Sequence, residues 1–128
     1  MQIQTQIVDY ILSLINTKVG PLKPDNNISV EIAPGGDYTN FLNGSKLANI
    51  KLLVLCKNKN QKESYDNICS KVRFLERQRR FETNYLYKIN SITIDSPPSF
   101  VTKENGEWIY SAILNINYSD KEKNTWEI

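Results

Sequence analysis

An Asn-Gly pair at residues 105–106 separates two stretches whose composition is typical of β-strands. Asn-Gly is a strong signal for a tight hairpin, because both central residues of a type I′ turn need positive φ angles. After the pair, aromatic or aliphatic side chains occupy every second position from 108 to 118. This period of two predicts a long strand with one buried face. The alternate positions include Ser111, Asn115 and Asn117, which predict a second face that its own chain covers only in part.

Upstream of the hairpin, apolar spacing predicts two helices. Isoleucine, leucine and valine recur at helical spacing from residue 3, which predicts an amphipathic helix over about 3–18, before Gly20-Pro21. Tyr65, Ile68, Cys69, Val72 and Leu75 recur at intervals of three and four. This spacing predicts a second helix over about 61–81.

Three strands are predicted between and after these helices. Residues 28–32 alternate and predict a short half-buried strand that ends at Pro34. Residues 47–56 are almost continuously apolar, which predicts a central strand covered on both faces. Residues 85–94 form the third strand, and their change of parity at Asn90-Ser91 indicates a bulge.

The order of these elements defines an expected fold class. We expect an α+β protein with a single mixed, mostly antiparallel sheet of four to five strands. Two helices should pack on one face, and a β-hairpin should protrude. A chain of 128 residues corresponds to one domain, residues 1–128.

Charge and composition limit the classes of partner. The chain carries 16 Lys plus Arg and 14 Asp plus Glu, a net charge of +2. This balance gives no reason to expect general nucleic-acid affinity or a polybasic membrane anchor. The N-terminus lacks a signal-peptide layout, and no apolar run approaches the ~20 residues of a membrane span. We therefore expect a soluble protein with no membrane partner and no specific nucleic-acid partner.

Twelve residues lie between the two cysteines, Cys56 and Cys69. Since the chain is long enough to form a core without covalent staples, we expect free buried thiols. One should lie in a strand and the other on a helix face.

The sequence offers little chemistry for catalysis. Histidine is absent, which removes the commonest general base and the commonest metal ligand. GGDYTN and NGSK do not form a phosphate loop, and KPDNN lacks the spacing of a calcium loop. The carboxylates are scattered singly. We expect no enzyme activity, no cofactor and no metal.

An arginine group near the end of the second predicted helix allows three interpretations. RFLERQRR contains Arg77, Arg79 and Arg80. Cations are stabilised at a helix C-terminus by the macrodipole, so the group can simply be a solvated helix end. It can also pair with acidic residues of a neighbouring subunit, since arginine is enriched in interfaces. A nucleic-acid surface is the third interpretation, although no RNP-type motif supports it.

Two aromatic features add candidate contacts. Residues 33–46, APGGDYTNFLNGSK, predict a long loop, which is either only mobile or a site of partner contact through Tyr38 and Phe41. The hairpin, residues 98–108, adds Phe100 and Lys103 as candidate contacts.

The C-terminal block INSITIDSPPSFVTKENGEWIYSAILNINYSD, after the short strand ISVEI and the helix ESYDNICSKVRFL, resembles a known group. It is similar to the minor capsid, tail-terminator and tail-to-head joining (tail-completion) proteins of tailed bacteriophages. The resemblance covers nearly the whole chain as a pattern of elements, and it transfers no invariant functional residue.

The resemblance implies a structural role in the virion, at the head-proximal end of the tail. Tail terminators form a ring, usually of six subunits, on the tail tube. The ring ends tube polymerisation and offers the surface on which the head connector or completion protein docks. The implied partners are a second copy of the chain, the tail tube protein and the head connector, after assembly in the cytoplasm of a bacterial host.

Two alternatives remain. One is another phage component, such as a head-completion or baseplate protein or part of a tail-like particle. The other is a small nucleic-acid-binding α+β module that uses Tyr85, Tyr87 and the arginines as a stacking and phosphate surface.

Overall fold

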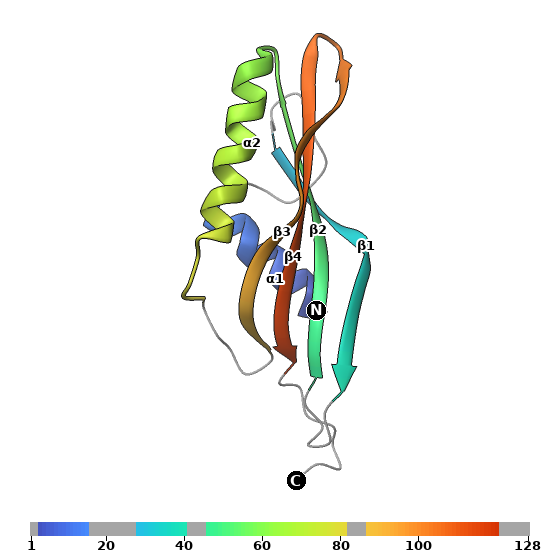
Figure 1. Cartoon of the computed structure of the whole chain (residues 1–128), viewed down its shortest axis with the longest axis vertical. Coiled ribbons are helices and arrows are strands. Elements are labelled where there is room, and N and C mark those ends of the chain that lie inside the picture. Colours follow the sequence, from blue (N-terminus) through green and yellow to red (C-terminus); the bar gives the residue numbers. More distant parts are fainter. Residues whose placement is uncertain (1–2, 16–27, 41–45, 82–86, 121–128) are drawn as a thin grey trace.

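The computed structural model describes residues 3–15, 28–40, 46–81 and 87–120. The four strands form one sheet in the order β1-β2-β4-β3 (Figure 1), and every described strand pair is antiparallel. The chain is therefore an α+β protein, as the sequence predicts, but its described sheet is not mixed. The elements in chain order are α1 (Ile3–Leu14), β1 (Ile28–Asn40), β2 (Lys46–Asn58), α2 (Gln61–Glu76), β3 (Tyr87–Glu104) and β4 (Glu107–Asp120).

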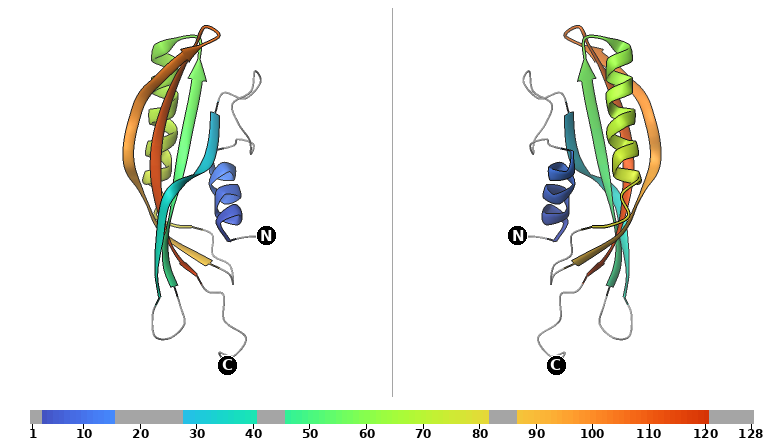
Figure 2. Two further views of the ribbon diagram at one scale, coloured as in Figure 1. Left: turned by 90° about the vertical axis from the view of Figure 1, so that its right-hand side faces the viewer. Right: turned by 90° about the vertical axis from the view of Figure 1, so that its left-hand side faces the viewer.

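Both helices pack on the same face of the twisted sheet. α2 lies along the end of the sheet near the β3–β4 turn, and α1 lies farther toward the other end (Figure 2). One parity of β2 and of β4 faces them, and these side chains join the helices in a single core. Burying each large aliphatic side chain stabilises the fold by about 1.5–3 kcal/mol, so this face holds the sheet and helices together. Its fully buried members include Ile7, Ile11, Leu52, Val54, Ile68, Leu75, Leu114 and Ile116.

α2 has a well-defined start and ends earlier than predicted. The Asn60 side chain accepts a hydrogen bond from the backbone N–H of Glu63 at 3.0 Å, which caps the first turn. The helix ends at Glu76, with Arg77 as the C-cap, rather than near residue 81. The Gln78 side chain, just beyond the helix, donates a hydrogen bond to the carbonyl oxygen of Phe74 in the last turn, which satisfies one of the terminal acceptors of the helix.

β1 continues past Pro34 and β2 begins at Lys46, so the predicted loop over residues 33–46 is wrong for residues 33–40 and for residue 46. The β1–β2 ladder shifts register between Ala33 and Asp37 and then resumes as far as Asn40. β1 is the outer strand of the sheet, and a proline without an N–H is tolerated on an edge strand or at a bulge. The Pro-Gly-Gly sequence therefore makes an irregularity within the strand instead of ending it.

β2 is a central strand between β1 and β4, as predicted. The prediction that both of its faces are covered is wrong, because only one parity is fully buried. Ile50, Leu52 and Val54 face the helices, whereas Lys51 and Leu53 on the other face are half-buried. The sequence could not predict this difference between the two faces of β2, because leucine occurs on both of them. β2 extends to Asn58, so the predicted loop after residue 56 shortens to two residues.

β3 runs as one irregular edge strand from Tyr87 to Glu104. The bulge predicted at Asn90-Ser91 is confirmed by a register shift between Ile89 and Ser91. Further register shifts occur around Pro97 and Pro98, and the strand continues beyond these two prolines. Because β3 is at the edge of the sheet, these residues need no second ladder partner.

The β3–β4 turn has the conformation that Asn-Gly predicts. Asn105 has φ 52° and Gly106 has φ 77°, and Glu104 pairs with Glu107 across the turn. The predicted protrusion is not confirmed. β4 pairs with β2 as far as Trp108↔Asn58, so only the end of the hairpin extends past the central strand.

Candidate functional site

The hairpin carries a row of aromatic side chains that reaches α2, and we call Tyr65, Phe100, Trp108 and Tyr110 the aromatic row. The Phe100 ring lies 5.7 Å from both the Trp108 and the Tyr110 ring centroids. Tyr65 of α2 makes an edge-on contact with Tyr110 at 5.4 Å. These offset and edge-to-face geometries are the favoured ones for aromatic pairs. The row joins both strands of the hairpin to the helix.

Two polar side chains of α2 hold the hairpin against the helix. The fully buried hydroxyl of Ser64 donates to the backbone oxygen of Trp108 at 2.7 Å. The Gln61 side-chain amide donates to the Tyr110 hydroxyl at 3.1 Å. Hydrogen bonds that satisfy buried groups limit the ways in which two elements can pack. The hairpin is therefore anchored along α2.

The structure brings the predicted contacts Phe100 and Lys103 together on this hairpin. Phe100 is 51% exposed although it contacts two rings, and Val101 beside it is 50% exposed. The Lys103 ammonium lies 4.9 Å from the centre of the Trp108 ring, a cation–π distance. Trp108 and Tyr110 are largely covered, as the sequence predicts for core residues. This part of β3 presents apolar and aromatic surface to solvent.

The arginines at the end of α2 divide into two kinds. Arg79 donates from Nη1 to the backbone oxygens of Glu76 at 2.8 Å and Gln78 at 3.2 Å, so it satisfies acceptors at the helix end. Arg77 and Arg80 are exposed and make no ion pair with another described residue. The helix-end interpretation thus accounts for the contacts of Arg79 and for the position of Arg77, the C-cap residue. Neither Arg77 nor Arg80 has a carboxylate partner among the described residues.

The two aromatic residues of the predicted loop, Tyr38 and Phe41, have different outcomes. Tyr38 lies in β1, opposite Ala48 of β2, and not in a loop. Phe41 lies outside the described residues. The sequence missed the strand because Pro34 and two glycines precede Tyr38.

The predicted site residues do not form one cluster. The 16 residues of α2 span about 24 Å, and the arginines lie at the opposite end of the helix from the aromatic row. Tyr38 belongs to β1, whereas Phe100 and Lys103 belong to β3, the other edge of the sheet. The predicted contact residues that the structure describes therefore lie in three separate parts of the fold.

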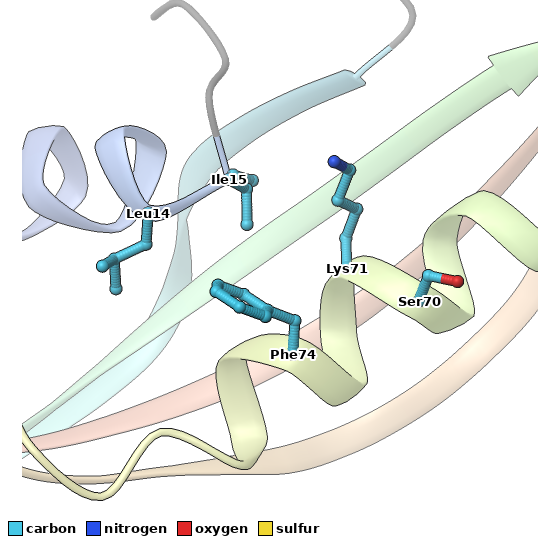
Figure 3. A pocket seen from close by; sticks show the side chains of 5 residues that line it. All are labelled: Leu14, Ile15, Ser70, Lys71 and Phe74. Carbon is cyan, nitrogen blue, oxygen red and sulfur yellow. The ribbon is translucent and has the colours of Figure 1, made fainter.

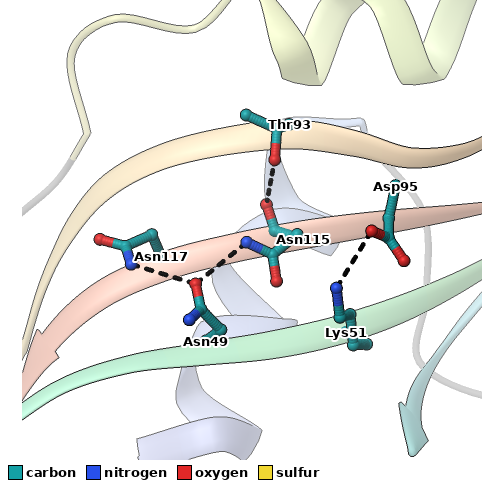
Figure 4. A network of polar contacts seen from close by, with 6 residues as sticks. All are labelled: Asn49, Lys51, Thr93, Asp95, Asn115 and Asn117. Atoms are coloured by element: carbon teal, nitrogen blue, oxygen red, sulfur yellow. Dashed lines mark hydrogen bonds and ion pairs between the residues drawn. The ribbon is translucent and has the colours of Figure 1, made fainter. Parts of the chain in front are cut away.

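The sheet face away from the helices carries a network of amide side chains (Figure 4). Asn49 of β2 accepts hydrogen bonds at its Oδ1 from the side chains of Asn115 and Asn117 of β4, each at 3.0 Å. Asn90 of β3 donates to Asn117 Oδ1 at 3.0 Å and to Ser119 at 3.1 Å. The network ties three strands together. The alternation in β4 predicted a polar face there. It did not predict the contribution of Asn49, because this residue lies within an almost continuously apolar stretch of β2.

Charged pairs extend this polar face. Lys51 of β2 and Asp95 of β3 form an ion pair of 3.1 Å that crosses over β4 (Figure 4). Lys57 and Glu107 approach at 3.7 Å near the hairpin. Each of these two lysines on the face is therefore paired with a carboxylate.

Pockets open on the described surface at both ends of the second half of α2. One, of about 300 Å³, lies between the helices, where Phe74 of α2 points toward Leu14 of α1, and Lys71 of α2 and Ile15, just after α1, also line it (Figure 3). The other, of about 410 Å³, lies between the end of α2 and β3, with Arg79 in its lining. Ser70 also lines the first pocket beside Lys71, but no hydrogen bond joins their side chains, so the pocket shows no activated serine.

The two thiols are free and lie in a strand and on a helix, as predicted, but only one of them is buried. Cys56 is buried in β2, and Cys69 is partly buried on α2. Burial raises the pKa of the Cys56 thiol to about 12. A thiol with such a pKa stays protonated at neutral pH, so Cys56 is a poor nucleophile.

The described residues contain no group of three or more histidine, cysteine or carboxylate side chains placed to hold a metal ion. Neither described helix is long and apolar enough to cross a membrane.

Fold and surface together define a small antiparallel α+β domain, with two helices on one sheet face and candidate contact surfaces on both outer strands and at one helix end. A scan against protein-family models found no match, and a search of curated proteins found no significant match.

Proposed function

We propose that this protein is a structural component of a bacteriophage or phage-tail-like particle, and that it forms a ring, six-membered in the simplest case, on the head-proximal end of the tail tube. The ring would end polymerisation of the tube protein and offer a docking surface to the head connector. The resemblance of the sequence to tail-terminator and tail-completion proteins suggests this function.

One structural observation carries most of the support: the candidate contact surfaces lie on different sides of the subunit. A cyclic ring uses head-to-tail contacts, in which each subunit needs two different complementary surfaces. Phe100 and Lys103 belong to β3 at one edge of the sheet, and Tyr38 belongs to β1 at the other. Candidate contact residues on both edges of the sheet fit the two different contacts that a ring requires, whereas a single binding pocket would not.

The arginine end of α2 supplies the third surface for this proposal. Arg77 and Arg80 are exposed and have no ion-pair partner among the described residues. Arginine is enriched at protein interfaces, where its planar guanidinium pairs with carboxylates. We assign these two residues to contact with an acidic surface of a neighbouring subunit.

The nucleic-acid alternative has less support. It requires exposed rings on which bases can stack. Tyr87 is only 5% exposed, and Tyr85 lies outside the described residues. A titration with single-stranded DNA at two salt concentrations tests this alternative, because true phosphate binding weakens strongly with salt. A different phage role, in head completion or the baseplate, would use the same surfaces, and electron microscopy of the particle would separate these roles.

The experiment that tests the ring is light scattering with negative-stain imaging over a concentration series. Arg77→Glu with Arg80→Glu should weaken ring formation, because charge reversal in an interface costs several kcal/mol. Lys59→Glu with Lys62→Glu is the matched control, since Lys62 is exposed in the first turn of the same helix and Lys59 is exposed just before its N-cap. Both pairs should change the free energy of unfolding by no more than about 0.5 kcal/mol. If the arginine variant forms rings as the wild type does, the arginines are only a solvated helix end. If no species beyond a dimer forms under any condition, including with tube ends added, the ring proposal fails.

A further inference from the structure

We propose that the pocket between the two helices binds a small amphipathic anion, a carboxylate whose charge pairs with Lys71 and whose apolar body lies between Leu14 and Phe74. The inference concerns a site that the ring proposal does not use. It rests on the position and charge of Lys71, on the apolar walls of the pocket and on the exposure of Phe74.

Lys71 brings a positive charge into this pocket. It is the charged residue among the described residues that line the pocket, and its side chain is partly buried (Figure 3). Burial raises the pKa of the Cys56 thiol in β2, and the positive charge of Lys71 acts on that pKa in the opposite direction. The ammonium therefore lies close enough to the sheet to be felt at a buried residue, and not wholly in bulk solvent.

The described chain supplies no counter-charge to this lysine. Lys71 forms neither a hydrogen bond nor an ion pair with a described residue. The helix neighbours that could pair with it stand three and four positions away. None of them is acidic, since they are Asn67, Ile68, Phe74 and Leu75. A partly desolvated cation without a partner is unfavourable, so an anion in the pocket would be stabilised there.

The walls beside Lys71 are mainly apolar. Leu14 and Ile15 line the pocket from the end of α1, and the ring of Phe74 points toward Leu14 (Figure 3). Phe74 is 46% exposed. An apolar group placed between Phe74 and Leu14 would cover part of this surface, and removal of apolar surface from water favours binding.

The size of the pocket limits the ligand. Its volume of about 300 Å³ is at the lower end of the range of about 300–1,000 Å³ that ligand pockets span. Apolar walls with a few polar groups that fix the orientation are the usual composition of such sites. A carboxylate with a short aliphatic chain or a single ring matches the pocket in charge, polarity and size. We expect a dissociation constant on the order of 0.1–1 mM, because so small a ligand makes few contacts.

The pocket beside Arg79 is a poorer site for the same ligand. Nη1 of Arg79 already donates to the backbone oxygens of Glu76 and Gln78. Its guanidinium therefore has acceptors within the chain, whereas the ammonium of Lys71 has none among the described residues.

Isothermal titration calorimetry with octanoate and with 1-octanol tests the site. The two probes have the same apolar chain and differ in charge. Octanoate should bind the wild type with one molecule per chain, about fivefold more tightly than 1-octanol, which corresponds to a partly screened ion pair. This comparison needs no variant, so it does not depend on how a substitution affects folding.

Variants of Lys71 separate its charge from its packing. Lys71→Met keeps an unbranched side chain without the charge, so it should weaken octanoate binding about fivefold and leave 1-octanol binding unchanged. Lys71→Arg keeps the charge and should retain the preference for octanoate. Lys62→Met is the matched control, because Lys62 is exposed on the same helix and does not line the pocket. It should bind both probes as the wild type does.

Amide chemical shifts locate the bound probe. Octanoate should shift the amide signals of Leu14, Lys71 and Phe74 in a saturable manner, and leave that of Lys62 unchanged. Four results would each overturn the proposal: no saturable binding up to about 10 mM octanoate, shifts confined to other residues, equal affinity of the wild type for the two probes, or equal effects of Lys71→Met and Lys62→Met. Arg77→Glu with Arg80→Glu should bind octanoate as the wild type does. The ring proposal can therefore fail while this site stands, and the reverse also holds.

Discussion

The hydroxyl of Ser64, in the first turn of α2, donates a hydrogen bond of 2.7 Å to the backbone oxygen of Trp108 in β4. Ser64 is fully buried, and its Oγ also lies 3.4 Å from the backbone oxygen of Cys56 in β2. One small side chain thus links the helix to two strands beside the hairpin. The aromatic row lies next to this link, so Ser64 sets the position of the surface that we assign to partner contact.

Replacing Ser64 tests this link. Ser64→Ala should lower the free energy of unfolding by about 1–2 kcal/mol, because it leaves a buried carbonyl oxygen without its donor. Urea unfolding monitored by tryptophan fluorescence measures the loss. Ser70→Ala is the matched control, since Ser70 is exposed on the same helix. An equal effect of both changes would show that the hydrogen bond adds nothing.

The amide network predicts a contrast at Asn49. Asn49→Ala removes the oxygen that accepts from Asn115 and Asn117, and should cost about 1 kcal/mol of unfolding free energy. Asn49→Asp keeps an acceptor oxygen in the same place and should retain most of the stability. Urea unfolding of both variants at neutral pH is the measurement. If the aspartate variant is as unstable as the alanine variant, acceptance by this oxygen is not what stabilises the face.

The β3–β4 turn predicts a backbone effect. Gly106→Ala should cost about 1 kcal/mol, because φ at this position is +77° and a side chain disfavours that conformation. A Cβ at this position would meet no atom within 4 Å, so the cost comes from the backbone alone. Asn105→Gly, which accepts positive φ freely, is the control and should stay close to the wild type. Thermal unfolding compares the three proteins, and an unchanged Gly106→Ala melting temperature would contradict the turn conformation.

The Cys56 thiol predicts a pH dependence. Its folded-state pKa of about 12 lies above the ordinary value of 9.0. Above pH 9 the unfolded chain therefore loses this proton while the folded chain keeps it, so stability falls as pH rises toward 12. Between pH 8 and pH 10 the wild type should lose roughly 1 kcal/mol relative to Cys56→Ala, which has no thiol to titrate. If the free energy of unfolding depends on pH in the same way in both proteins, the Cys56 thiol has the same pKa in the folded and the unfolded state.

Much of the fold could be predicted because its signals are local. Asn105-Gly106 specifies a turn through its own backbone preferences, and the alternation that follows specifies which side of β4 is buried. The bulge at Asn90-Ser91 was visible as a change of parity in a single strand. Each of these features depends on residues that are neighbours in the sequence.

The errors have a common physical cause, which is that position in the sheet changes what a residue can do. Pro34 was expected to end a strand, but β1 is an edge strand, where a missing N–H costs little. The same reasoning explains why Pro97 and Pro98 lie within β3. The sequence does not state which strands are outermost, so it could not predict that these prolines would be tolerated.

The candidate surfaces show the same division. By itself, the sequence determined the element order, the helix-facing parity of β4, the hairpin turn and the exposed arginines, because periodicity and turn preference act over a few residues. Only the tertiary structure decided that Tyr38 and Phe100 lie on opposite edges of the sheet and that α2 holds the hairpin. It alone joined Asn49 to Asn115 and Asn117. Those relationships depend on strand order and register, which arise from contacts between residues far apart in the chain and are selected by burial of the whole core.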